Sequence, residues 1–246
     1  MLSCVDVSKA FDGVVALDRV SVSFAPGQLC AVIGPNGAGK TTLFNVLTGF
    51  VRPDAGRCLM GSREITHQRP NRIAREGLAR TFQDLRLVRR LSVLENVLLA
   101  FPHQDGENLL RAVCRVGLYA QDSALRKEAI EILSTVNLAE SRQKVAGELS
   151  YGQQKLLTMA SCIATRAGTL LLDEPVSGVD PATAERVLRV LADLRAQGKT
   201  VVFVEHDITA VRQSADRVLV MSQGSVIADG IPEDVLGRRD ILEAYV

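Results

Sequence analysis

The sequence contains no tryptophan, and aromatic residues make up only 4% of its 246 positions. Aromatic side chains are the usual platforms on which nucleic-acid bases stack, so a base-stacking surface is not expected. An excess of charge of either sign is also missing, because 29 Lys and Arg residues are balanced by 28 Asp and Glu residues. Nucleic-acid-binding domains generally carry a basic excess, so the two absences predict that nucleic acid is not a partner.

Long hydrophobic runs are absent as well, although hydrophobic residues make up 47% of the chain. No stretch approaches the length that crosses a bilayer, so any membrane role is expected to act through a partner. The first residues include Asp6 and no basic segment, so a secretory signal is not expected. The cysteines lack CxxC spacing, and an odd, dispersed set is typical of reduced buried thiols in a cytosolic protein. They are Cys4, Cys30, Cys58, Cys114 and Cys162.

A glycine-rich segment fits the phosphate-binding pattern G-x-x-x-x-G-K-[ST] in full. Before it, the short apolar run 29–33 predicts a buried strand, and after it 42–47 predicts the start of a helix. Backbone N–H groups of such a loop and the positive end of the helix dipole bind anions. Lys40 would then reach the β- and γ-phosphates of a nucleoside triphosphate, and the Thr41 hydroxyl would hold Mg²⁺; the alternative is a plain glycine-rich turn. The loop consists of Gly34, Pro35, Asn36, Gly37, Ala38, Gly39, Lys40, Thr41 and Thr42.

The order of the other patterns predicts an α/β fold with a mostly parallel sheet, because apolar strands alternate with helices. One of these helices begins at Pro181, a residue favoured in the first turn. The segments 2–7 and 20–24 are predicted as strands of an antiparallel part, since 20–24 alternates strictly between apolar and polar residues. The apolar strands are predicted at 169–173, 200–204 and 218–221, followed by a hairpin arm at 224–230.

Few strand patterns occur between about 85 and 166, which predicts a helical insertion. A helix is expected over 93–98, with Ser92 as its N-cap and Glu95 at the capping-box position. A second helix is expected over 151–165. The predicted organisation is one domain, in which 1–84 and 167–246 form the core with its antiparallel part and 85–166 forms the helical subdomain.

An acidic pair, Asp173 and Glu174, ends the apolar strand that begins near 169. Carboxyl ends of parallel strands face the phosphate loop in sheets of this kind, so Asp173 is a candidate Mg²⁺ ligand. Glu174 could polarise an attacking water molecule. The alternative is a surface acidic pair at a strand end.

The segment 149–154, Leu-Ser-Tyr-Gly-Gln-Gln, resembles the signature of ATP-binding cassette (ABC) ATPases, whose usual form is LSGGQ. The order of motifs is similar to that of the family: phosphate loop, a Gln after a strand, signature, Asp-Glu strand, and a His after a strand. Gln83 matches the family's Q-loop, 177–180 its D-loop and His206 its switch histidine. Phe11 stands where the family places an aromatic residue that stacks on adenine. The resemblance covers essentially the whole chain.

The resemblance implies a P-loop NTPase (RecA-like) core with a mostly parallel sheet, an antiparallel β subdomain and a helical insertion that carries the signature. It implies a Mg²⁺-dependent ATPase whose signature closes on ATP held by a second subunit, so that hydrolysis requires a dimer. Core packing for Phe11 and an ordinary loop amide for Gln83 stay open as alternatives. The implied catalytic residues are Glu174, His206, Lys40 and Gln83, the implied metal ligands are Thr41, Gln83 and Asp173, and the implied ATP contacts outside the phosphate loop are Phe11, Ser150, Gly152 and Gln153.

Further segments resemble the ATPase subunits of branched-chain amino-acid importers and of the related urea and amide importers, among them Thr-Phe-Gln at 81–83 and Val-Glu-His-Asp at 204–207. The implied partners are integral membrane transporter subunits, a second ABC ATPase subunit and, indirectly, an extracytoplasmic solute-binding protein. The implied location is peripheral, on the cytoplasmic face of the cell membrane. A urea or amide importer ATPase, and a soluble ABC ATPase without a transport role, stay open as alternatives.

Overall fold

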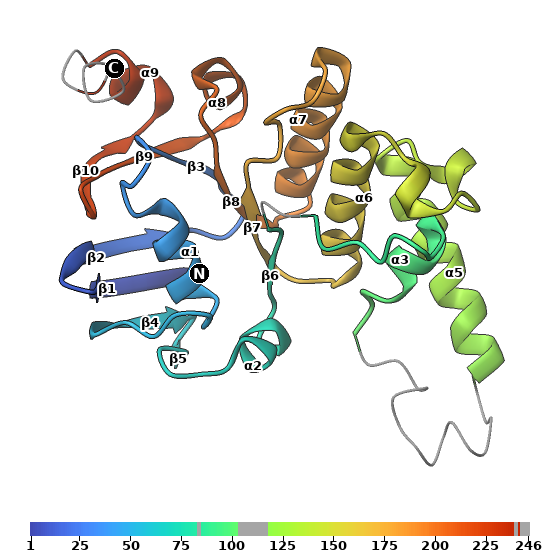
Figure 1. Ribbon diagram of the computed structural model, residues 1–246, viewed down its shortest axis with the longest axis horizontal. Helices are drawn as coiled ribbons and strands as arrows, with labels where there is room; N and C mark the ends of the chain where they lie inside the picture. The colour runs from blue at the N-terminus through green and yellow to red at the C-terminus, as the bar shows by residue number, and fades with distance from the viewer. Residues whose placement is uncertain (83–84, 103–117, 239–240, 242–246) are drawn as a thin grey trace. The chain divides into compact units, whose positions relative to one another are not determined.

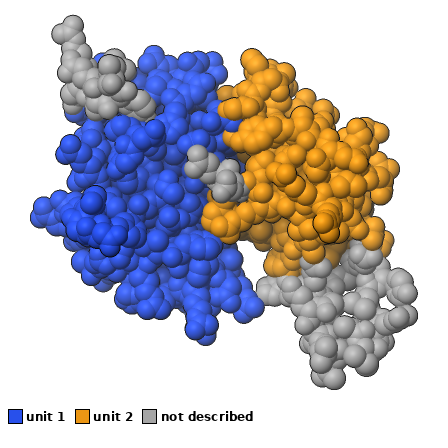
Figure 2. Space-filling view, viewed as in Figure 1, with its two compact units in different colours: residues 1–80, 168–177, 191–246 blue, residues 81–167, 178–190 orange. Residues whose placement is uncertain are grey.

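A computed structural model describes residues 1–82, 85–102, 118–238 and 241. The chain divides into two compact units, which Figure 2 distinguishes by colour. The first unit comprises 1–80, 168–177 and 191–246, and the second comprises 81–167 and 178–190. The structure thus groups 178–190 with the second unit, whereas the sequence-based division assigned them to the core.

The first unit contains a six-stranded sheet in the order β10-β9-β3-β8-β7-β6 (Figure 1). Five of these strands are parallel and β10 pairs antiparallel with β9, which confirms the predicted mostly parallel sheet and the hairpin arm. Every residue of β3, β7 and β8 is buried, as expected for parallel strands covered on both faces. The strands are β3 (Leu29–Ile33), β6 (Leu78–Arg80), β7 (Thr169–Asp173), β8 (Thr200–Val204), β9 (Arg217–Ser222) and β10 (Ser225–Gly230).

A four-stranded antiparallel sheet in the order β2-β1-β4-β5 belongs to the same unit. Burial alternates over 20–24, as the sequence predicted. The first two strands extend beyond the predicted 2–7 and 20–24, because Asp12 and Gly13, with φ of 47° and 84°, form a turn that continues the hairpin. The strands are β1 (Leu2–Phe11), β2 (Val14–Phe24), β4 (Ala55–Met60) and β5 (Arg63–Glu64).

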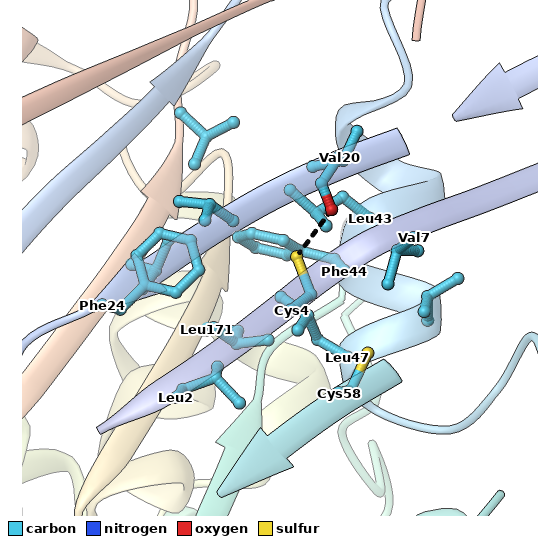
Figure 3. Close-up of a cluster of buried hydrophobic side chains, with 14 of the residues drawn as sticks. Leu2, Cys4, Val7, Val20, Phe24, Leu43, Phe44, Leu47, Cys58 and Leu171 are labelled. Carbon is cyan, nitrogen blue, oxygen red and sulfur yellow. Dashed lines mark hydrogen bonds between the residues drawn. The ribbon is translucent and has the colours of Figure 1, made fainter. Parts of the chain in front are cut away.

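Helix α1 (Lys40–Leu47), which follows the phosphate loop, contributes to the core that joins the two sheets. Figure 3 shows Phe44 of this helix among Phe24 of β2, Leu171 of β7 and Leu2 of β1. The Cys4 thiol donates a hydrogen bond to the Val20 carbonyl at 3.6 Å, and burial raises its pKa to about 11. Buried free thiols are also found at Cys30, Cys58 and Cys162, as predicted, and Cys114 lies outside the described residues.

The second unit is built from helices that contact one another, as the helical insertion predicted. Helix α3 (Val93–Leu98) begins with the predicted capping box, in which the Ser92 hydroxyl accepts from the Glu95 N–H. Helices α5 (Leu118–Thr135) and α6 (Tyr151–Ala164) pack on α3 and on each other. The remaining helices are α2 (Pro70–Arg75) in the first unit, α7 (Pro181–Ala196), α8 (Ile208–Ser214) and α9 (Pro232–Leu236), with 3₁₀ turns at Ala139–Ser141 and Ala146–Glu148. Within the described part of the chain, no helix is long and apolar enough to span a membrane.

Phe24→Ala is expected to lower the free energy of unfolding by about 3–5 kcal/mol, because it removes a fully buried aromatic side chain from the core. Ile227→Ala is the matched control on β10, since Ile227 is 41% exposed and its truncation should change stability by about 0.5 kcal/mol or less. Urea unfolding followed by far-UV circular dichroism measures both values without tryptophan fluorescence. Equal losses in the two variants would contradict the position of the core.

Candidate functional site

Two glycines of the phosphate loop stand where the backbone leaves no room for a side chain. A Cβ on Gly34, at φ of 150°, would lie 2.1 Å from the Met221 carbonyl oxygen, and one on Gly39, at φ of 100°, would lie 2.4 Å from that of Ala16. The Gly224 N–H donates to the Ala38 carbonyl at 3.1 Å. The loop backbone therefore packs closely against β2 and the end of β9. This packing holds the loop in the curled conformation that anion binding needs.

The Lys40 ammonium lies inside this loop. Its Nζ donates to the carbonyl oxygens of Gly34 at 2.6 Å and of Pro35 at 2.9 Å, and the residue is 6% exposed. Burial lowers the pKa of Lys40, and the negative charges of Glu174 and Asp173 oppose that shift. The lysine and both carboxylates thus lie close enough to interact electrostatically. Asn36, Gly37 and Thr41 are exposed, Pro35 and Thr42 are half-buried, and Ala38 is buried.

The Asp173 carboxylate, at the end of β7, forms a buried ion pair with an arginine to which the sequence analysis gave no role. Its Oδ2 accepts from Arg80 Nη2 at 3.2 Å, and the Arg80 and Asp173 side chains are 5% and 6% exposed. Arg80 also donates to Asn45 Oδ1 at 2.7 Å and to Thr48 Oγ1 at 3.3 Å, and its guanidinium lies 5.5 Å from the centre of the Phe44 ring. The arginine therefore joins β6, β7 and the helix that follows the phosphate loop.

Glu174 and His206 lie side by side. The His206 Nε2 is 3.1 Å from Glu174 Oε1, and the two side chains are 39% and 20% exposed. Glu174 has a positive φ of 48°, which is uncommon outside glycine, and its N–H donates to the Val204 carbonyl at 3.0 Å. The end of β7 is thus fastened to β8 in a conformation that turns the Glu174 side chain toward the histidine.

The signature residues lie in the second unit, at the N-terminus of α6. The Ser150 hydroxyl accepts from the Gln153 N–H at 3.3 Å, and the Gln153 side chain accepts from the Ser150 N–H at 3.1 Å. Gly152 is buried against α7, where an added Cβ would lie 3.1 Å from Thr183 Cγ2. This close packing explains why 178–190 group with the second unit. A helix N-terminus of this kind carries the positive end of the helix dipole, which favours anion binding.

Two further predicted site residues are Phe11 and Gln83. Phe11 ends β1 with 44% of its surface exposed, and the Lys9 Nζ lies 5.3 Å from the centre of its ring. The core-packing alternative is therefore wrong for Phe11, and its adenine contact stays a prediction. Gln83 lies outside the described residues. Among the residues that are described, no group of three or more His, Cys, Asp or Glu side chains could hold a metal ion.

Arg80 and Glu205 have buried charged side chains to which the sequence analysis assigned no function. Glu205 is 1% exposed and follows a fully buried strand, β8. A charged residue at the carboxyl end of such a strand is the signal that could have drawn attention to it, because an unpaired buried charge is costly. Arg80 ends the short strand β6 in the same way.

The six-stranded sheet and the wedged loop around Lys40 define a P-loop nucleotide-binding protein. Residues 17–177 match the family described as ABC transporter. The chain belongs to this family, whose members are ATPases.

Curated relatives align over nearly the whole chain. The high-affinity branched-chain amino acid transport ATP-binding protein BraF of Pseudomonas aeruginosa is 37% identical over 241 residues, which cover 96% of this chain and 93% of BraF. The probable branched-chain amino acid transport ATP-binding protein LivG of Archaeoglobus fulgidus is 37% identical over 246 residues, which cover 100% of this chain and 95% of that protein. The resemblance to this branch of the family is therefore confirmed.

Solved structures of ABC cassettes share the fold. A nucleotide-free ATP-binding cassette from an ABC transporter matches with a TM-score of 0.86 and 32% identity, covering 100% of this chain and 98% of the other. A dimeric ATP-binding cassette in a post-hydrolysis state, bound to ADP and Pi, matches with a TM-score of 0.78 and 25% identity over 94% of this chain and 99% of the other. The predicted P-loop NTPase fold is thereby confirmed.

Arg80→Met is expected to lower the free energy of unfolding by about 3–5 kcal/mol, because it leaves the Asp173 carboxylate buried without its cation. Combining it with Asp173→Leu should recover most of that loss, since the remaining buried charge is then removed. Urea unfolding by circular dichroism provides the measurement.

Arg63→Met is the matched control, because Arg63 pairs with Glu76 and its side chain is 64% exposed. This change should lower stability by about 1 kcal/mol or less. Strictly additive losses for Arg80→Met and Asp173→Leu would contradict the importance of the buried pair.

Proposed function

We propose that this chain is the ATP-binding and ATP-hydrolysing subunit of a membrane importer of branched-chain amino acids. The observation that carries the proposal is that the segments bearing Lys40, Asp173, Glu174 and His206 lie at the carboxyl ends of the neighbouring parallel strands β3, β7 and β8, where Glu174 and His206 are 3.1 Å apart. This is the set of groups that phosphate binding and water activation require. The similarity to BraF supports the choice of branched-chain amino acids as the transported class.

Each residue has a definite task in this proposal. Lys40 and the loop N–H groups bind the β- and γ-phosphates, and their positive charge stabilises the transition state. Glu174 accepts a hydrogen bond from the attacking water and orients it, while His206 contacts the γ-phosphate. The 3.1 Å contact between Glu174 and His206 supports a shared position of both side chains at the reacting phosphorus.

The site residues also fit a magnesium ion. The Asp173 carboxylate and the Thr41 hydroxyl are hard oxygen donors, and Mg²⁺ in nucleotide sites takes one or two protein oxygens together with waters and phosphate oxygens. A small protein ligand set agrees with the lack of any larger carboxylate or histidine cluster among the described residues. When bound, Mg²⁺ would neutralise charge on the β- and γ-phosphates. Gln83 is proposed as a further contact to the metal and the water.

The signature supplies the argument for a dimer. Ser150, Gly152 and Gln153 form a helix N-terminus suited to a phosphate, yet they lie in a different unit from the phosphate loop. We infer that they bind ATP held by a second ABC subunit, as the dimeric form of the similar cassette supports. Phe11, exposed at the end of β1, is proposed to stack on adenine.

The location follows from the same proposal. The dimer would work at the cytoplasmic face of the cell membrane, beneath integral membrane subunits. An extracytoplasmic solute-binding protein would deliver the amino acid to those subunits.

Glu174→Gln is expected to lower kcat for ATP hydrolysis about 100-fold or more, because an amide cannot act as the water-polarising base. ATP binding should persist, so the variant should accumulate as a closed dimer in size-exclusion chromatography with ATP and Mg²⁺. Glu233→Gln, an exposed carboxylate on α9, is the control and should keep the wild-type rate. Wild-type turnover by Glu174→Gln would rule out the assigned role.

Deleting the gene in its native host should abolish high-affinity uptake of radiolabelled leucine, isoleucine and valine. The wild-type gene should restore that uptake and the Glu174→Gln gene should not, because transport needs hydrolysis. Loss of urea or amide uptake, with normal leucine uptake, would instead support the alternative importer class. Unchanged uptake of all these solutes would contradict the proposed transport role.

A further inference from the structure

Glu205 is a buried carboxylate that links the two chain segments on which Glu174 and His206 lie. It directly follows β8 and is 1% exposed. Its Oε1 accepts a hydrogen bond from the Val176 N–H at 2.7 Å. Its Oε2 accepts from the His206 N–H at 3.2 Å. One side chain therefore holds the segment after β7 and the segment after β8 together.

These two hydrogen bonds are important because one segment carries Glu174 and the other carries His206, the two side chains proposed to act on the water and the γ-phosphate. Val176 lies two residues after Glu174, whose left-handed conformation must be held by its surroundings. His206 is the residue whose imidazole lies 3.1 Å from the Glu174 carboxylate. A shift in either backbone segment would change that distance directly.

The chemistry of the two bonds requires a carboxylate. Backbone N–H groups approach both oxygens, so both ends of the side chain must accept hydrogen bonds. A glutamine side chain of the same shape has one acceptor oxygen and one NH₂ donor. Its NH₂ group would face the N–H of either Val176 or His206, so one of the two hydrogen bonds would be lost. Burying a charge is unfavourable unless it is strongly hydrogen-bonded, and bonds to a carboxylate are stronger than neutral ones.

We propose that Glu205 is a positioning residue for ATP hydrolysis: it sets the geometry of Glu174 and His206 through the backbone, without touching the nucleotide. This inference rests on the proposed ATPase function. It adds a role for a residue outside the phosphate loop, the acidic pair and the switch histidine. Catalysis is sensitive to such placement, since a displacement of about 1 Å can change a rate by about 100-fold.

Glu205→Gln tests the inference in the full chain. We expect kcat for ATP hydrolysis to fall about 10- to 100-fold, while KM for ATP and the affinity for ADP change less than about 3-fold. Nucleotide affinity should persist because the two N–H groups that Glu205 accepts from, those of Val176 and His206, lie outside the phosphate loop. A wild-type kcat, or a change in KM alone, would overturn the inference.

A second measurement separates positioning from loss of folded protein. In single-turnover assays, adding Glu205→Gln to Glu174→Gln should lower the rate by a clearly smaller factor than Glu205→Gln lowers the wild-type rate, because one of the two side chains that Glu205 positions is already replaced. A loss of folded protein would lower the rate by the same factor in both backgrounds. That multiplicative outcome would also overturn the inference.

Asp216→Asn is the matched control. The Asp216 Oδ2 likewise accepts from a backbone N–H, that of Leu29 at 3.0 Å, but it does so at the beginning of β3, the opposite end of the strand from the phosphate loop. Its kcat should stay within about 2-fold of wild type. If the wild-type chain releases no phosphate from ATP, the proposed function fails. If the wild-type chain hydrolyses ATP and Glu205→Gln does so at the same rate, the proposed function stands and the positioning role fails.

Discussion

Parallel pairing of β3, β7 and β8 is the constraint on which the candidate site depends. Val204 at the end of β8 pairs with Val32 of β3 and with Asp173 of β7. Because parallel strands run in the same direction, the three segments that follow them leave the sheet at one edge. The phosphate loop, the acidic pair and the Glu205-His206 segment are therefore neighbours in space although they are far apart along the chain.

Buried charge is concentrated at this edge. Among the described residues, the buried charged side chains at this edge are those of Lys40, Arg80, Asp173 and Glu205. Each is held by polar groups: carbonyl oxygens around Lys40, Arg80 beside Asp173, and backbone N–H groups around Glu205. Charges in a poorly solvated region interact strongly, so these contacts stabilise the ions and also restrict their positions. Rigid placement of charge is what a phosphate-transfer site requires.

Much of the fold could be predicted from the sequence, because the relevant physics is local. Alternation over 20–24 needs only the two-residue period of a strand, and the capping box at Ser92 needs a partner three residues away. The phosphate loop is equally local, since its glycines and Lys40 lie within one short segment. The order of motifs indicated Glu174 and His206 as site residues, but it did not predict the contact between their side chains.

The sequence by itself thus determined the buried strands β3, β7 and β8, the starts of α3, α6 and α7, the phosphate loop and the family to which the chain belongs. Only the tertiary structure decided which buried charges meet: Arg80 reaches Asp173, 93 positions away, and Glu205 reaches Val176, 29 positions away. Local pattern does not specify the strand order β10-β9-β3-β8-β7-β6, and these contacts depend on that order. A buried charge needs a partner, but strand pairing across the sheet selects which partner it has.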